Sequence, residues 1–285
     1  MTLHTRVGEA EVYRREYERG AVYWSQHTGA HEVHGEIAAR WHARGDVRIE
    51  DVPRPVPAPD EALVQVLWCG ICGTDLEEYR EGPIAIPVVP HPRRGSVAPI
   101  VLGHEIVGVV HTAAADGSGP PAGTLVIPDV VIGCGTCSWC LRHEEGLCPS
   151  LAVRGQTEDG GLAEYMVARA STCLQVPDGV PAEHAALTEP TAVAVRALRK
   201  LDRLVGARIT VVGAGAVGQL VARVAAASGA RVELVVDTRP ARRERAQRGG
   251  ATETLDPSTA CIRLKPWSAA HPEPGSRLLQ GILRS

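Results

Sequence analysis

Two short runs of the chain contain side chains that commonly bind a catalytic metal ion. The first reads Trp-Cys-Gly-Ile-Cys-Gly-Thr-Asp-Leu-Glu-Glu-Tyr over residues 68–79, and the second is Gly103-His104-Glu105. Cys72, His104 and Glu105 offer a thiolate, an imidazole and a carboxylate, and a catalytic zinc ion takes three such ligands and keeps one position open. From the residue types alone, a cysteine beside glycines is more often a small apolar side chain than a ligand.

Two neighbours of Cys72 strengthen the prediction of a metal site. Thr74 lies two residues further on, where its hydroxyl would contact a zinc-bound alcohol. Asp75 would orient a histidine ligand by accepting a hydrogen bond from its second ring nitrogen. The run therefore predicts a zinc centre whose chemistry is directed at an alcohol oxygen.

Four further cysteines form the strongest local signal in the chain. They follow the spacing Cys-x2-Cys-x2-Cys-x7-Cys at Cys134, Cys137, Cys140 and Cys148. Four protein ligands leave zinc no open position, so this spacing predicts a structural site. A nucleic-acid-binding zinc ribbon has similar spacing, but only Arg142 and His143 are basic between the second and last cysteine, and two glutamates follow them.

The next feature is a glycine-rich motif between two apolar runs. Residues 208–212 lead into Gly-Ala-Gly-Ala-Val-Gly, the following positions keep helical spacing, and a second run, 232–237, ends on an aspartate. This order predicts a dinucleotide-binding fold, in which the glycines let the backbone approach a pyrophosphate at a helix N-terminus. The expected cofactor-binding residues are Gly213, Gly215, Val217, Gly218 and Asp237.

The aspartate also predicts which dinucleotide is bound. Asp237 would accept a hydrogen bond from the adenosine ribose and repel a 2′-phosphate, so NAD is favoured over NADP. Arg239 and Arg242 weaken that preference, because either cation is suited to a phosphate.

The elements that must position the zinc ligands are predicted to be strands and a stiff loop. Short alternating runs at 47–52 and 62–68 are separated by prolines, as in a small β-barrel. Residues 82–99 contain five prolines, which exclude a helix or a central strand. This segment is expected to be an extended loop and a candidate wall of the substrate pocket, although the residues alone favour an ordinary surface loop.

The runs at 70–75 and 103–105, together with Glu-Gly-Pro-Ile-Ala-Ile-Pro at 81–87 and Pro-His-Pro at 90–92, resemble the zinc-dependent medium-chain alcohol and polyol dehydrogenases. The resemblance covers roughly residues 36–258 and is strongest to the 2,3-butanediol dehydrogenase branch. It implies a mixed α/β plus all-β fold: a GroES-like β-barrel catalytic domain followed by a Rossmann domain, a doubly wound parallel sheet that is truncated here.

The same resemblance implies roles for individual residues. Cys72 is the metal ligand and Cys69 a packed thiol. Glu189, before Pro190, corresponds to a further zinc carboxylate, whereas from sequence alone its charge simply favours a helix N-terminus. Glu77 stands where many relatives have a histidine, which leaves the last proton acceptor after Thr74 as a carboxylate or solvent.

The remaining residues do not follow the dehydrogenase pattern. Residues 17–41 resemble one partial LGFP repeat of actinobacterial envelope proteins, and the three histidines within them are expected to lie in a solvated turn. The predicted organisation is an appendage at 1–35, the zinc domain at 36–190 with a structural lobe at 134–148, half of a NAD-binding domain at 191–258 and an atypical tail at 259–285. The tail is expected to reflect a truncation or a change of reading frame, and the alternative is an unusual short variant with its own ending.

Composition narrows the classes of partner. The 285 residues are 44% hydrophobic with a formal net charge of −3, which favours neither nucleic acid nor an anionic membrane. No apolar run approaches the roughly 20 residues of a membrane span, and no secretory segment is evident, so a cytoplasmic location with reduced cysteines is expected. A small-molecule alcohol or diol is the expected partner, and the family resemblance implies homo-oligomers.

These patterns together predict an oxidoreductase that transfers hydride between a secondary alcohol or vicinal diol and NAD, with one catalytic and one structural zinc ion. The expected catalytic residues are Cys72, Thr74, His104, Glu105 and Glu189. The alternative prediction is a non-catalytic remnant of such an enzyme, stabilised by zinc.

Overall fold

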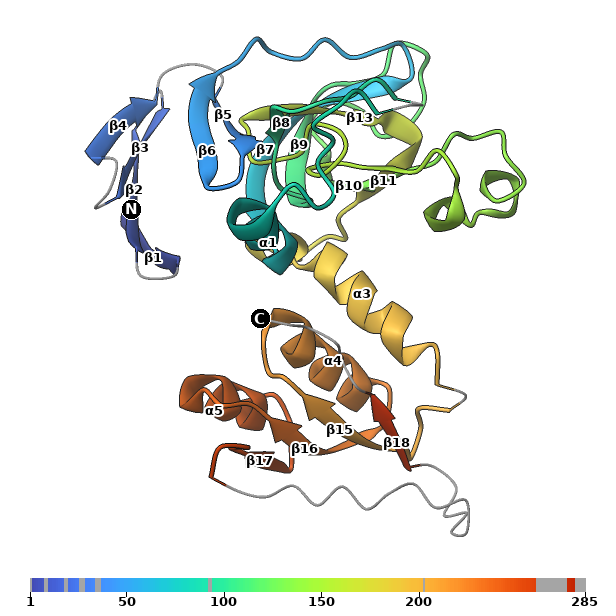
Figure 1. The fold of residues 1–285 in the computed structure, drawn as a ribbon. Coiled ribbons are helices and arrows are strands. Elements are labelled where there is room, and N and C mark those ends of the chain that lie inside the picture. The colour runs from blue at the N-terminus through green and yellow to red at the C-terminus, as the bar shows by residue number, and fades with distance from the viewer. Residues whose placement is uncertain are drawn as a thin grey trace. The chain divides into compact units, whose positions relative to one another are not determined.

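The computed structural model describes the chain as two compact units, residues 1–186 and 187–285 (Figure 1). The described residues are 2–7, 10–17, 20–25, 29–33, 37–91, 94–201, 203–259 and 276–279.

The N-terminal residues form an antiparallel sheet of four consecutive strands. In order, they are β1 (Thr2–Val7), β2 (Ala10–Tyr17), β3 (Gly20–Ser25) and β4 (Gly29–Val33). The segment predicted to be an LGFP repeat, 17–41, therefore continues beyond this sheet into the next strand. Of the three histidines predicted to lie in a turn, His31 lies in strand β4, so that prediction is wrong for it, and His27 and His34 are outside the described residues.

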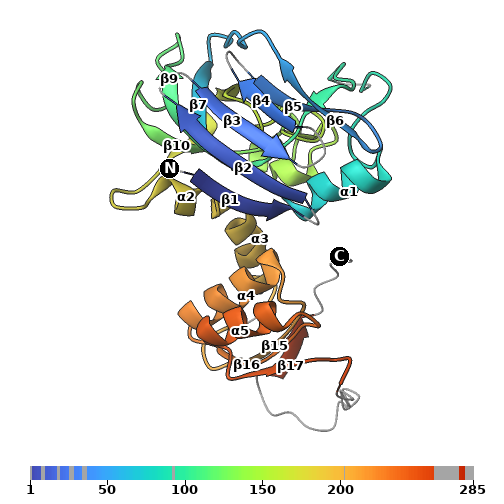
Figure 2. The ribbon, with the colours of Figure 1, turned by 90° about the vertical axis from the view of Figure 1, so that its left-hand side faces the viewer.

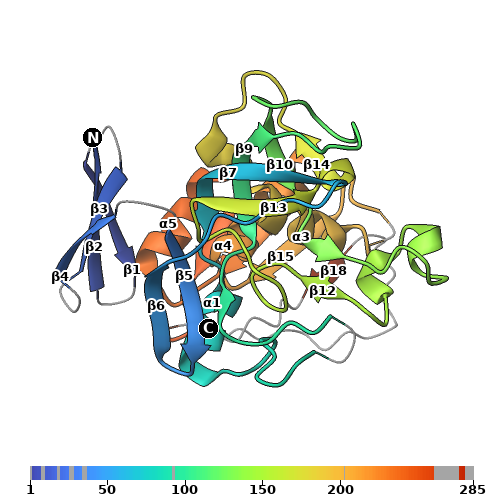
Figure 3. The same ribbon diagram turned by 90° about the horizontal axis from the view of Figure 1, so that it is seen from above.

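A barrel-like pair of antiparallel sheets forms the centre of the first unit. The larger sheet has the order β13-β7-β9-β10-β14, and Figure 3 shows its strands side by side. The smaller sheet has the order β6-β5-β8. The strands are β5 (Ile37–Ala43), β6 (Asp46–Asp51), β7 (Glu61–Gly70), β8 (Ile100–Val101), β9 (Glu105–Thr112), β10 (Leu125–Pro128), β13 (Tyr165–Arg169) and β14 (Cys173–Gln175).

Apolar residues that alternate along the strands form the core of this unit. Val64 and Ile106, on neighbouring strands, are almost wholly buried with Val126 and Met166. Trp41 of β5 packs with Ile86, and its indole N–H donates to the backbone oxygen of Glu78 at 3.0 Å. Since Trp41 is part of this core, β5 belongs to the zinc domain rather than to the N-terminal sheet.

Helix α1 (Gly73–Glu81) follows β7 directly and was not predicted from the sequence. A second departure from the barrel is the cysteine lobe, which contains the 3-10 turns η1 (Cys140–Arg142) and η2 (Glu145–Leu147) and is flanked by the short pair β11 (Val131–Ile132) and β12 (Ala152–Val153). The unit ends with the turn η3 (Ala170–Thr172), before β14, and helix α2 (Ala182–Ala185).

The second unit is a parallel four-stranded sheet with the order β17-β16-β15-β18. Figure 2 shows helices α4 and α5 on one face of this sheet. The elements are α3 (Thr188–Leu198), β15 (Arg208–Val212), α4 (Ala216–Ala227), β16 (Arg231–Val236), α5 (Pro240–Arg248), β17 (Glu253–Leu255) and β18 (Ser276–Leu279). The strand, helix and strand around the glycine motif lie where the sequence predicted them. Strand β18 was not predicted, because residues 259–285 carry no strand signal.

Candidate active site

The N-terminus of α1 brings together the residues of the first predicted metal-binding run. Cys72 is the N-cap, and its backbone N–H donates to Asp75 Oδ2 at 2.8 Å. This bond satisfies one of the backbone donors that a helix start leaves without a partner in the helix. It also turns the Asp75 carboxylate inward, where only 4% of the residue is exposed.

The buried carboxylate faces the second run. His104 lies between β8 and β9, and its Nδ1 is 3.6 Å from Asp75 Oδ1. Burial raises the pKa of Asp75, while the nearby His104 and the Cys72 N–H act in the opposite direction. This separation is longer than a hydrogen bond, but a carboxylate on the Nδ1 side would favour a proton on that nitrogen and leave Nε2 as the nitrogen able to bind a metal ion.

The Nε2 atom of His104 lies beside the hydroxyl of Thr74, another predicted catalytic residue. The Thr74 hydroxyl is 3.4 Å from this nitrogen, and Thr74 itself is exposed. The structure thus brings Asp75, Thr74 and His104 together, with the carboxylate near one ring nitrogen and the hydroxyl near the other. Their roles at a zinc-bound alcohol stay predictions.

Glu105 is held close to Gly70 across the β7–β9 pair. A β-carbon added to Gly70 would overlap the Glu105 carboxylate. The glycine thus leaves a space that the carboxylate fills, and this space fixes where Glu105 points. The assignment of Cys72, His104 and Glu105 as one ligand set stays a prediction, because within the described residues the ligand atoms converge only at the four-cysteine cluster.

Two other predictions concern residues around this set. Cys69 is partly buried, and burial raises the pKa of its thiol far above the ordinary value. This environment suits a packed thiol better than a thiolate ligand. Glu189 lies in the first turn of α3, in the second unit, so its role as a further zinc ligand stays a prediction.

The four clustered cysteines have the geometry of a tetrahedral thiolate site. Their sulfur atoms all lie within 4.8 Å of one another, and three of the separations are 3.5, 3.8 and 3.9 Å. Tetrahedral zinc with Zn–S bonds of about 2.3 Å requires sulfur atoms about 3.8 Å apart. None of the cysteines in the described residues forms a disulfide, so the donor set fits zinc.

Backbone amides point at these sulfur atoms. The N–H groups of Cys134 and Ser150 donate to Cys148 Sγ, each at 3.3 Å, and the N–H of Cys137 donates to Cys134 Sγ at 3.3 Å. Hydrogen bonds from Thr136 are the main cause that lowers the pKa of Cys134 to about 5, whereas burial raises the pKa of Cys140 to about 11. The surroundings therefore favour the thiolate form of Cys134 but not that of Cys140.

The predicted dinucleotide loop closes onto the predicted acidic residue. Asp237 Oδ2 accepts the N–H of Ala214 at 2.8 Å, and Oδ1 accepts the N–H of Arg239 at 2.8 Å. Gly213 has a φ of 94°, and a β-carbon on Gly218 would overlap the Gly213 oxygen. These positions require glycine, so the sequence motif forms the tight turn that it predicted.

The arginine that qualified the cofactor prediction lies against the same carboxylate. Arg242 Nη1 is 3.6 Å from Asp237 Oδ2. The predicted adenosine-binding carboxylate therefore lies at ion-pair distance from an arginine.

One buried acidic residue of helix α1 was not predicted from the sequence. Glu78 lies in α1 three residues after Asp75 and is 3% exposed. Its carboxylate accepts the backbone N–H groups of Ile84, Ala85 and Ile86. The sequence offers only an indirect signal for such a residue. Pro83 and Pro87 flank three residues whose backbone N–H groups need acceptors, and a nearby carboxylate can supply them.

Comparison with known proteins supports a family assignment. The pattern of the "Alcohol dehydrogenase GroES-like domain" matches residues 58–178. An (R,R)-butanediol dehydrogenase of Bacillus subtilis is 35% identical over 222 residues, which cover 78% of this chain and 63% of that protein. The crystal structure of 2R,3R-butanediol dehydrogenase from Bacillus subtilis superposes with a TM-score of 0.73 at 34% identity, covering 80% of this chain and 65% of that one.

Residues 58–178 belong to the alcohol dehydrogenase GroES-like domain family, and the chain as a whole is similar to zinc-dependent medium-chain alcohol dehydrogenases. It is similar to the butanediol dehydrogenase branch, as the sequence predicted. A zinc-binding dehydrogenase from Sinorhizobium meliloti, solved with NADP bound, has a TM-score of 0.72 at 30% identity and covers 80% of this chain and 63% of that one. The chain spans less than two thirds of the length of these relatives.

A second pattern, the LGFP repeat, matches residues 4–47. It begins within β1, includes β2 to β5 and ends within β6. No helix within the described residues is both long enough and apolar enough to cross a bilayer.

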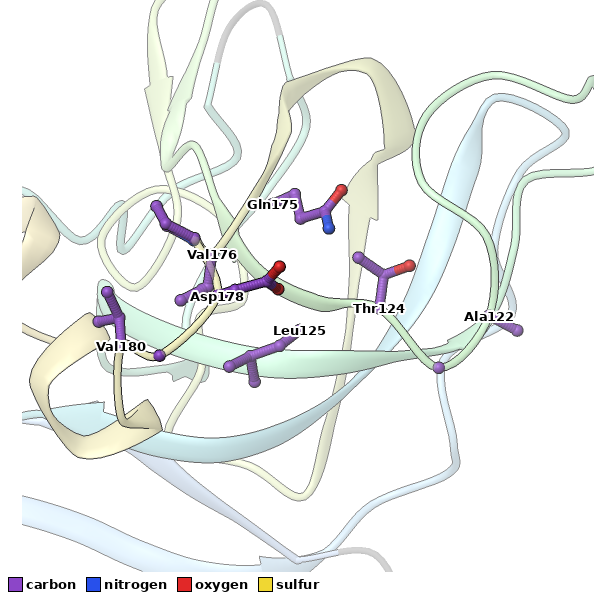
Figure 4. Close-up of a pocket in the computed structure, with 10 residues that line it drawn as sticks. Ala122, Thr124, Leu125, Gln175, Val176, Asp178 and Val180 are labelled. Carbon is purple, nitrogen blue, oxygen red and sulfur yellow. The ribbon is translucent and has the colours of Figure 1, made fainter.

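The dehydrogenase domain also has an open depression that is separate from the predicted site residues. Figure 4 shows that its lining comes from two segments, residues 122–125 and 175–180. None of the predicted catalytic or metal-binding residues lines it, so the predicted chemistry is not directed there.

Proposed function

We propose that this chain contains the zinc and dinucleotide sites of an NAD-linked oxidoreductase for secondary alcohols or vicinal diols. The observation that carries the proposal is the arrangement of Asp75, His104 and Thr74, with one histidine nitrogen beside a buried carboxylate and the other beside an exposed hydroxyl. The relatives named as butanediol dehydrogenases support a diol as substrate. A cytoplasmic location is part of the same proposal.

When bound, zinc supplies Lewis-acid polarisation of an alcohol oxygen and the nicotinamide supplies a hydride acceptor. The residues of the chain would organise this chemistry. Asp75 holds the proton on His104 Nδ1, and the Thr74 hydroxyl accepts the proton of the alcohol and passes it outward. Thr74 is exposed, so solvent or the nearby exposed carboxylate of Glu77 is the next acceptor.

We further propose two zinc ions and a preference for NAD. The thiolate cluster supports a closed structural site, and Cys72, His104, Glu105 and Glu189 would hold the catalytic ion. Asp237 supports NAD because its charge would repel a 2′-phosphate. A relative solved with NADP makes direct competition between NAD and NADP the appropriate check of this preference.

The metal assignment is tested with single substitutions in the full chain. We expect His104→Ala to bind one zinc ion fewer than the parent, because the mutant loses the Nε2 ligand while the four-cysteine lobe is intact. His184→Ala is the matched control, since His184 is exposed on α2. Zinc is counted by atomic emission after dialysis.

Cys137→Ser distinguishes the second site in the same measurement. It should lose the other zinc ion and expose the lobe to protease. If the zinc content of His104→Ala equals that of the parent, the proposed catalytic site is wrong, whatever the lobe contains.

A further inference from the structure

The buried carboxylate of Glu78 holds a segment of backbone beside the metal-binding helix. Its Oε2 accepts the N–H of Ile84 at 3.0 Å, and its Oε1 accepts the N–H of Ile86 at 3.1 Å and that of Ala85. Both oxygen atoms are therefore used. A carboxylate with little solvent exposure needs such donors, because burying a charge without hydrogen bonds is costly.

Every backbone N–H group between Pro83 and Pro87 has a hydrogen-bond acceptor. Pro83 and Pro87 have no N–H, so Ile84, Ala85 and Ile86 supply every amide donor in this stretch. All three donate to Glu78 rather than to a strand or a turn. One side chain therefore accepts all the amide hydrogen bonds that this stretch donates.

The chain enters this segment through a close approach to Glu78. Gly82 donates its N–H to the Glu78 backbone oxygen at 3.0 Å, and a β-carbon on Gly82 would overlap that oxygen. The same oxygen accepts the indole N–H of Trp41. Glu78 is thus fixed at its backbone as well as at its carboxylate.

The segment that Glu78 holds is unusually apolar for an exposed loop. Ile86 is buried, but Ile84, Val88 and Val89 are 61%, 54% and 69% exposed. Exposed apolar groups gathered on one segment commonly mark a binding site. Helix α1 carries Glu78 and also Thr74 and Asp75, so one nine-residue helix holds this segment and the groups around His104.

We propose that Glu78 is a positioning residue for the alcohol site, fixing residues 83–89 as an apolar wall for the carbon chain of the substrate. This inference rests on the proposed function for its ligand. The anchoring itself rests only on the hydrogen bonds of Glu78.

The chemistry of the contact requires a carboxylate. A glutamine has one acceptor oxygen, so its NH2 group would face at least one backbone N–H. An aspartate keeps the charge but is one methylene shorter and does not reach all three donors. Glu78→Gln and Glu78→Asp therefore disturb the same contact by different means.

Hydrogen exchange of the full chain tests the anchoring. We expect the amides of residues 84–86 to exchange about 10-fold faster or more in both variants, because the lost hydrogen bonds involve a charged group. Glu81→Gln is the matched control, as Glu81 lies in the same helix and is exposed. Exchange at the parent rate in both Glu78 variants would overturn the inference.

The substrate part of the inference needs a second readout. The full chain is loaded with Co2+ and titrated with 2,3-butanediol, and the change in the cobalt absorption gives the half-saturating concentration. We expect Glu78→Gln to raise this concentration about 10-fold while the spectrum without diol stays unchanged. A changed spectrum without diol, or an unchanged half-saturation, would show that Glu78 does not position the alcohol wall.

Failure of the proposed function gives a different result. If the parent binds Co2+ only at the four cysteines and does not respond to the diol, the proposed function and the alcohol wall both fail. The exchange rates of residues 84–86 still decide whether Glu78 anchors the segment.

Discussion

At the scale of single residues, the space beside Gly70 decides where the Glu105 carboxylate lies. Gly70→Ala places a methyl group on that carboxylate, so Glu105 has to move. We expect the variant to weaken zinc binding at the His104 site by about 10- to 100-fold, as for other changes that shift groups around a metal ion. Competition with a colorimetric chelator measures the affinity.

Gly73→Ala provides the control for this prediction. Gly73 is close in sequence, but a β-carbon there meets nothing within 4 Å. It is also the first residue of α1, where alanine is favoured over glycine. Equal zinc affinities for the two variants would mean that the position of Glu105 does not matter to the metal site.

The residues that sequence could identify are those whose chemistry is local. Cys72, Thr74 and Asp75 stand in one short run, and the four lobe cysteines have diagnostic spacing. The sequence did not indicate Glu78, because its three partners become visible only once the chain has turned back past Gly82. A buried carboxylate of this kind has no motif.

At the scale of elements, the strands could be predicted from local sequence patterns, whereas helix α1 could not. The strand around 62–68 and the strand at 208–212 were predicted because alternating or continuous apolar residues mark them. Helix α1 has no apolar face, and its buried residues are Asp75 and Glu78. Its stability comes from capping and buried hydrogen bonds, which periodicity does not detect.

Arg94 joins the proline-rich segment to the cysteine lobe. Its Nη2 donates to the backbone oxygens of Ile132 and Gly133 at 3.0 and 3.2 Å, and its Nε donates to that of Ser150 at 3.4 Å. These carbonyls stand just outside the two ends of the lobe. We expect Arg94→Ala to destabilise the zinc-bound chain by about 1–3 kcal/mol, since it removes the donors of partly buried carbonyls.

Urea unfolding and the rate of zinc loss measure this effect. Arg142→Ala is the comparison, because Arg142 is an exposed lobe residue paired with Glu144, and such pairs contribute about 0–1 kcal/mol. If both arginine variants lose zinc at the same rate, Arg94 does not connect the two segments.

At the scale of the whole molecule, the dinucleotide unit follows a recognisable order of strands. The first three strands along the chain, β15, β16 and β17, are arranged from the middle of the sheet outward, and β18 lies on the other side of β15. This order, 3-2-1-4, matches the start of a doubly wound sheet, whose cofactor crosses the point between strands 1 and 4. The sequence predicted the first three strands because glycines and apolar runs mark them, whereas the pairing of β18 depends on backbone contacts remote in sequence.

The length of the chain relative to its relatives leads to the last prediction. The chain spans 63% of the Bacillus subtilis butanediol dehydrogenase, and in the proposed function its glycine loop and Asp237 would bind the adenosine and pyrophosphate side of the dinucleotide. Hydride transfer also needs the nicotinamide within about 3–3.5 Å of the substrate carbon, and such positioning contributes on the order of 7–11 kcal/mol.

We expect the 285-residue chain to bind NAD weakly and to reduce it slowly or not at all with 2,3-butanediol. Joining residues 1–258 to the remaining third of that relative should restore turnover, measured as NADH absorbance, and the same fusion with His104→Ala should stay inactive. Rapid NAD reduction by the unextended chain would contradict this prediction and show that the residues present already position the nicotinamide.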